Sequence, residues 1–240
     1  MDHQNTYATS PASGFFWSLL LTIVTTVTFG LAMMAIPPSG PNCPADCMVY
    51  PFGDLLRYYP RDYLWMMAAV IQLGILLMFF ISNHFNAPES RKFHSFSALM
   101  FAAISVAVLL LDYWIQFSVV PISVMKNETE GIPLLTQYNG HGIFIAMEEL
   151  GFILMSVAFG FLSTIYGKKS RLETALRWMY RTPVIVIVFA LGFYSFRHGL
   201  DRHYRVEVAA ISINWTVTIV AGILSCVHFK RPGKYLAEQC

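Results

Sequence analysis

Long apolar stretches, separated by polar segments, make up most of this chain. Six of them reach or approach the roughly 20 residues that a helix needs to cross the hydrocarbon core of a bilayer. The first stretch is longer than the apolar region of a typical signal peptide and follows no cationic segment, so we expect it to remain as a span. The six predicted spans are 15–36, 63–82, 94–120, 142–166, 182–196 and 208–229.

The composition agrees with this pattern and narrows the class of protein. Hydrophobic residues make up 56% of the chain and charged residues 12%, whereas an average soluble domain has about 25% charged residues. The sequence therefore predicts an all-α fold, an integral membrane bundle of six transmembrane helices with short loops. Residues 15–229 would form this domain, between cytoplasmic tails at 1–14 and 230–240.

The charge of the chain bears on its partners. The formal net charge is only +2, and the cations lie beside the apolar runs instead of covering one face. Nucleic acid is therefore not an expected partner, and the lipid bilayer is. The sequence predicts no particular oligomeric state.

The fifth apolar run is the shortest and ends at Arg197 and His198. We expect its helix to begin at Thr182 and Pro183, because proline is tolerated in the first turn of a helix. Residues 168–181 have cations on one face and apolar residues on the other, which is typical of a helix lying on the membrane surface. The sequence therefore predicts a separate amphipathic connector before a short fifth span.

The distribution of Lys and Arg predicts the orientation of the bundle. With the N-terminus in the cytoplasm, ten of the 16 Lys and Arg residues lie in cytoplasmic segments and six lie in outer loops. Because cytoplasmic loops of membrane proteins are enriched in these residues, we expect both termini in the cytoplasm and the bundle in a plasma or cytoplasmic membrane.

Two of the four cysteines agree with this orientation. Cys43 and Cys47 fall in the first outer loop, where an oxidising compartment would let them form a disulfide, whereas Cys226 and Cys240 fall on the cytoplasmic side. The spacing alone leaves two free thiols as an alternative to the disulfide.

Three carboxylates lie inside the predicted spans. Asp112 is in the third span, and Glu148 and Glu149 are in the fourth. Ionisable residues are costly within a membrane and ordinarily face the interior of a bundle, so their presence indicates a functional site.

Helical spacing assigns Glu148 and Glu149 to different faces of the fourth span. Glu149 shares its face with small and polar residues that recur at intervals of three, four or seven, namely Gly142, Ala146, Ser156, Gly160 and Ser163. Such a face packs against other helices, so we expect Glu149 to point into the bundle. Glu148 is about 100° further round the helix, among aromatic residues, and we expect it at the edge of the site.

Polar residues of other spans lie at the depth of Glu149. Gln72, Asp112, Glu149 and Asn214 each lie about eight or nine residues from the outer boundary, roughly 12–14 Å at the helical rise. Gln116 lies on the same face as Asp112. We therefore predict one ligand-binding site in the outer half of the bundle, formed by these five residues.

Cationic and histidine side chains border this layer on the outer side. Arg197 and His198 close the fifth span, and His141 opens the fourth. Arg197 is a candidate counter-ion for the carboxylates, although an arginine at a helix end ordinarily extends to the lipid headgroups.

No cofactor, metal or catalytic residue is assigned from the sequence. His84, His94 and His228 gather near the inner boundary, but no Cys or carboxylate accompanies them in a ligand pattern. The chain also lacks a Gly-rich phosphate loop, a nucleophile elbow, a His-Glu-x-x-His pair and a Cys-x-x-Cys pair.

Three classes of function remain open at this point. The leading functional hypothesis is a small transporter, channel or ligand-binding membrane protein that uses the acidic layer for a proton, a small cation or an amine. A membrane-embedded enzyme would instead use a buried carboxylate as acid or base on a lipid-like ligand. A structural or accessory subunit would use the same polar groups only to hold its helices together.

Overall fold

The structure, a computed structural model, describes residues 11–35, 39–40, 43 and 45–230. Most of the two predicted tails, at 1–10 and 231–240, and with them Cys240, lies outside the described residues.

The described part of the chain is all-helical, without β-strands, which confirms the predicted fold class at this level. Six of its helices are long and apolar enough to cross a membrane. These are α1 (Pro11–Met34), α2 (Leu64–Phe85), α3 (Lys92–Ser118), α6 (Ile143–Leu162), α7 (Arg171–His198) and α8 (Arg205–Phe229). Two short helices, α4 (Val120–Met125) and α5 (Ile132–Leu135), lie between α3 and α6.

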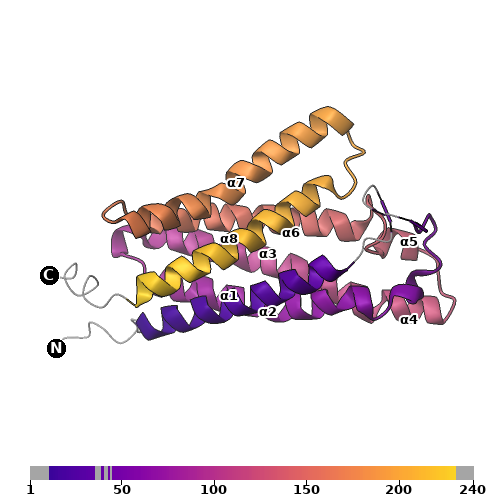
Figure 1. The fold of residues 1–240 in the computed structure, drawn as a ribbon, viewed down its shortest axis with the longest axis horizontal. Coiled ribbons are helices and arrows are strands. Elements are labelled where there is room, and N and C mark those ends of the chain that lie inside the picture. Colours follow the sequence, from indigo (N-terminus) through magenta and orange to yellow (C-terminus); the bar gives the residue numbers. More distant parts are fainter. Residues whose placement is uncertain (1–10, 36–38, 41–42, 44, 231–240) are drawn as a thin grey trace.

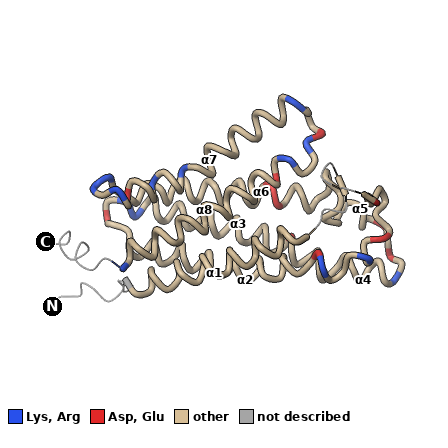
Figure 2. Tube along the Cα trace, viewed as in Figure 1, with Lys and Arg blue, Asp and Glu red and all other residues tan. Residues whose placement is uncertain are grey.

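Five of the long helices surround a common interior. Helices α1, α2, α3, α6 and α8 contact one another in that cyclic order, and α7 lies against α6 and α8 (Figure 1). The start of α1 and the end of α8 lie at one end of the bundle, here called the terminal end, and α4 and α5 lie at the other, the cap end (Figure 1). Figure 2 shows that charged residues gather at these two ends.

Small residues let neighbouring helices approach closely, as expected where apolar solvent gives no hydrophobic drive for helix association. A side chain at Gly151 of α6 would lie 2.5 Å from Leu109 Cγ of α3. The same contact carries a hydrogen bond, because the Ser105 hydroxyl of α3 donates to the Gly151 carbonyl oxygen over 2.7 Å. Gly222 likewise lets α8 approach α1 closely, because a side chain there would overlap Thr22 Oγ1.

Helix α7 differs from its prediction, because it runs without interruption through the predicted connector. It begins where the Ser170 hydroxyl accepts a hydrogen bond from the Glu173 backbone N–H over 3.1 Å, a cap that favours helix initiation at this point. Pro183 therefore lies in the helix interior, where it removes one backbone hydrogen bond. Beyond it α7 diverges from the bundle (Figure 1), and Phe196 near its end is 93% exposed.

The loops at the cap end contain short helices and a packed apolar cluster that the sequence did not predict. The segment before α2 and the segment between α3 and α6 share an apolar cluster, the cap, formed by Phe52, Leu55, Val120, Ile132 and Tyr138. These loops thus bury side chains of their own, which the description of short loops did not anticipate.

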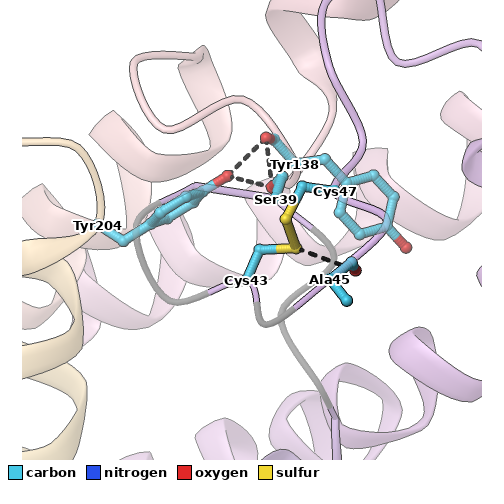
Figure 3. Close-up of a disulfide and its surroundings, with 6 residues drawn as sticks. All are labelled: Ser39, Cys43, Ala45, Cys47, Tyr138 and Tyr204. Carbon is cyan, nitrogen blue, oxygen red and sulfur yellow. Dashed lines mark hydrogen bonds between the residues drawn. A yellow bond between two sulfur atoms is a disulfide. The ribbon is translucent and has the colours of Figure 1, made fainter.

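Hydrogen bonds hold the cap to the start of α8, beside a disulfide within the first loop. The Tyr204 hydroxyl, just before α8, donates to the Tyr138 carbonyl oxygen over 2.5 Å and lies 2.8 Å from the Ser39 hydroxyl (Figure 3). Burial raises the pKa of Tyr204 to about 12, so the phenol stays a neutral donor at physiological pH. Cys43 and Cys47 form a disulfide beside these residues (Figure 3).

We predict that Gly151→Ala destabilises the bundle by about 1–3 kcal/mol, because the new methyl group overlaps Leu109. The double variant Gly151→Ala/Leu109→Ala should recover part of this loss, since it removes the overlapping side chain. Gly74→Ala is the matched control, because no atom lies within 4 Å of a side chain built there. Thermal unfolding in detergent measures all three, and equal stability of Gly151→Ala and Gly74→Ala would contradict the close α3–α6 contact.

Candidate functional site

Three carboxyl groups from three helices meet inside the bundle near the cap end. Asp112 of α3, Glu148 of α6 and Glu207 of α8 are buried, with 2%, 1% and 7% of their surfaces exposed. All three interact electrostatically with one another. We call these three residues the acidic cluster.

Glu148 lies at the centre of the acidic cluster. Its Oε1 accepts a hydrogen bond from the Tyr113 hydroxyl of α3 over 2.6 Å. Its carboxyl group also lies close enough to the Glu207 carboxyl group of α8 for a hydrogen bond, which would join α6 to α8. Asp112 is less well satisfied, because its Oδ2 is buried without a hydrogen-bond partner among the described residues.

Aromatic side chains line the bundle interior beside the acidic cluster. The Tyr113 ring lies 5.4 Å from that of Trp65 and 6.1 Å from that of Phe144. Trp215 of α8 continues this layer, 6.0 Å from Trp65 and 6.2 Å from Phe152. The carboxyl groups therefore face a densely packed, largely apolar interior.

The structure reverses the roles predicted for Glu148 and Glu149. The aromatic face of α6 points into the bundle, with Phe144, Phe152 and Phe159 on either side of Glu148. The small and polar face packs against neighbouring helices as predicted at Ser156 and Gly160, but Ala146, one turn before Glu149, is exposed. Glu148 is thus central and Glu149 lies at the edge.

Glu149 has a cationic partner at this edge. Its Oε1 lies 3.1 Å from Nη2 of Arg202, and the two side chains are 16% and 28% exposed, respectively. Arg202, in the turn between α7 and α8, also approaches the Ser195 hydroxyl of α7 at 3.5 Å. The predicted counter-ion, Arg197, is exposed on the diverging part of α7 and forms no ion pair with a described carboxylate.

Two of the predicted ligand-binding residues instead fasten elements together. The Gln116 side chain donates to the Leu135 carbonyl oxygen and accepts from the Gln137 backbone N–H over 3.0 Å, so it ties α3 to the cap. Asn214 Nδ2 donates to Ser156 Oγ over 2.8 Å and thereby links α8 to α6. Within the described residues, neither amide forms a hydrogen bond with a carboxyl group of the acidic cluster.

In the part of the chain that the structure describes, no hydrogen bond or ion pair joins the remaining predicted residues to the acidic cluster. Gln72 is buried in α2, and its Oε1 has no hydrogen-bond partner among the described residues. His141 is exposed, and its ring lies 6.1 Å from that of His203, which pairs with Asp201. His198 lies against Tyr194 on its own helix, with ring centroids 6.3 Å apart.

Sequence reasoning missed Glu207, Tyr113 and Arg202. Glu207 was excluded because the sixth span was predicted to begin at 208, whereas α8 begins at Arg205. The sequence did contain a sign of Glu207, because it lies two helical turns before Asn214 on the same face of α8, with Ala210 between them. Tyr113 follows Asp112 directly and carries no charge, so nothing in the pattern singled it out.

The described residues contain no group of three His, Cys, Asp or Glu side chains arranged to hold a metal ion. At the terminal end, His84 Nδ1 lies 2.9 Å from the Ser95 hydroxyl, and His94 is exposed. His228 packs edge-on against Tyr166, with ring centroids 5.5 Å apart. The three histidines thus have separate surroundings.

Comparison of the chain with protein-family models, with curated proteins and with solved structures finds no match. The fold and the acidic cluster define a helical protein with six candidate membrane spans and a buried carboxyl site.

We predict that Tyr113→Phe destabilises the protein by about 1–3 kcal/mol, because Glu148 loses its buried hydrogen-bond donor. The double variant Tyr113→Phe/Glu148→Leu should cost less than the sum of the two single changes, since each single change already removes the Tyr113–Glu148 hydrogen bond. Tyr194→Phe on α7 is the control for loss of a hydroxyl. Thermal unfolding of the set measures this coupling, and a double variant whose loss equals the sum of the single losses would refute the pairing.

Proposed function

We propose that this chain is a multi-pass membrane protein that takes up a proton in the acidic cluster, as a small proton-dependent transporter or ligand-binding protein. The observation that carries the proposal is the contact between the Glu148 and Glu207 carboxyl groups. Two carboxylates cannot donate to each other, so a hydrogen bond between them requires one proton.

The surface of the bundle supports placement in a membrane. Large apolar side chains are exposed along the long helices, among them Ile71 of α2, Leu111 of α3 and Val188 of α7, at 62%, 56% and 66%. A soluble monomer rarely exposes such extended apolar surface. Lipid would cover these side chains, and the polar groups would remain inside.

Burial favours a proton over a larger ligand. The carboxyl groups lie among packed aromatic rings, and the described residues offer no three-ligand arrangement for a metal ion. A proton needs no cavity and no ligand shell. The unpartnered Asp112 Oδ2 provides a second acceptor to which it could move from the Glu148–Glu207 pair.

Glu149 would connect this site to its surroundings. It interacts electrostatically with Glu207, and it is the carboxylate at the edge of the acidic cluster, where Arg202 pairs with it. Glu149 is therefore the proposed point at which a proton enters the acidic cluster.

Infrared difference spectroscopy between acidic and alkaline buffer tests the proposal. We predict a C=O band of a protonated carboxylic acid that Glu148→Gln and Glu207→Gln each remove, because an amide N–H can replace the shared proton without changing the shape of the side chain. Glu89→Gln, at a side chain 93% exposed, is the control and should retain the band. A band that persists in both cluster variants would reject the proton site.

We also propose that both termini are cytoplasmic, as the excess of Lys and Arg at the terminal end supports. The cap, with its disulfide, would then face the oxidising side. A membrane-impermeant maleimide should label Cys240 in inverted vesicles but not in sealed cells, with a Cys240→Ser variant as the control. Labelling from outside would reverse the orientation.

A further inference from the structure

Arginine side chains converge on one turn at the terminal end of the bundle. The turn is η4 (Ser163–Ile165), which directly follows α6. Arg91, before α3, donates from Nη1 to the Thr164 carbonyl oxygen over 2.9 Å. Arg181 of α7 approaches the adjacent Ser163 hydroxyl through Nε at 3.4 Å.

Arg177 lies one helical turn before Arg181 on the same side of α7. Its Nε is buried and has no hydrogen-bond partner among the described residues. A buried charged donor left unpaired is costly, so such a group calls for an acceptor. Glu173, the acidic residue nearest in α7, points instead to the 167–169 turn, where its Oε2 accepts from the Lys169 backbone N–H over 3.3 Å.

The free donors of these side chains suit a phosphate group. A guanidinium has five N–H donors, and Arg91 and Arg181 each use only one in the contacts above. Two parallel N–H groups of arginine match two phosphate oxygens, so clustered arginines are typical of phosphate sites.

The surroundings indicate a phosphate carried by a lipid. The Arg181 guanidinium lies 5.3 Å from the ring centroid of Trp178, which is 57% exposed. Exposed tryptophan beside a cation at the end of a membrane-spanning helix is typical of headgroup depth. A headgroup bound there would have its phosphate at the guanidinium groups and its acyl chains along the apolar surface of α7.

We propose that Arg91, Arg177 and Arg181 form a binding site for the phosphate group of an anionic phospholipid at the terminal end of the bundle. The site rests on placement of the chain in a membrane and is independent of the proton site at the cap end.

Native mass spectrometry of the full-length protein in detergent micelles tests this site by titration with phosphatidylglycerol, phosphatidylcholine and inorganic phosphate. Wild-type protein should retain phosphatidylglycerol in preference to phosphatidylcholine, whose phosphate is neutralised by its own choline. Arg177→Gln should weaken phosphatidylglycerol binding about fivefold, and Arg177→Gln/Arg181→Gln more, as expected for loss of each cation at a lipid surface.

Arg197→Gln is the matched control, because it removes the same charge from an exposed position at the other end of α7. It should bind phosphatidylglycerol as the wild type does. Arg177→Gln should also keep the thermal stability of lipid-free protein, because Arg177 makes no hydrogen bond within the described residues.

Either of two results would overturn the proposal. One is equal retention of phosphatidylglycerol by the wild type and the double variant. The other is displacement of bound lipid by inorganic phosphate at equal concentration, which would identify a site for free phosphate. Neither result bears on the infrared band of the acidic cluster, so the two proposals stand or fall separately.

Discussion

A carboxyl group held away from water must share a proton, pair with a cation or accept hydrogen bonds, and the cap end of this bundle is arranged around that constraint. Glu148 meets it with Tyr113 and Glu207, and Glu149 meets it with Arg202. Each of these contacts joins two elements that are distant in sequence. The same contacts that stabilise the carboxyl groups therefore also bring α3, α6 and α8 together.

The cap extends this polar organisation beyond the helices. Gln116 is one turn further along α3 than Asp112, and both of its hydrogen bonds go to the segment before α6. Tyr204 is one turn before Glu207, and it donates to the same segment. The two helix ends that carry Asp112 and Glu207 are thus fixed by one loop, which keeps the carboxyl groups in register.

The number, order and apolar character of the helices could be predicted from the sequence, because span length and composition are local properties. Which face of α6 points inward could not, because that depends on the space the neighbouring helices leave. Phe144 and Phe152 fill that space, and they bring Glu148 inward with them. Glu207 was missed for a related reason, since helix α8 begins earlier than its apolar run and only the assembled bundle buries its first turn.

The buried polar residues fall into two groups, according to whether their donors and acceptors are matched within the protein. Asn214 and Gln116 have donors and acceptors matched within the protein, which fully accounts for their presence in apolar helices. A structural role alone explains the acidic cluster less well, because an amide pair would join α6 to α8 without requiring a proton. A hydrogen bond between Glu148 and Glu207 requires one, and Asp112 Oδ2 contributes nothing to helix packing through a hydrogen bond within the described residues. Helix association alone therefore accounts for the carboxyl groups at these positions less fully than it accounts for Asn214 and Gln116.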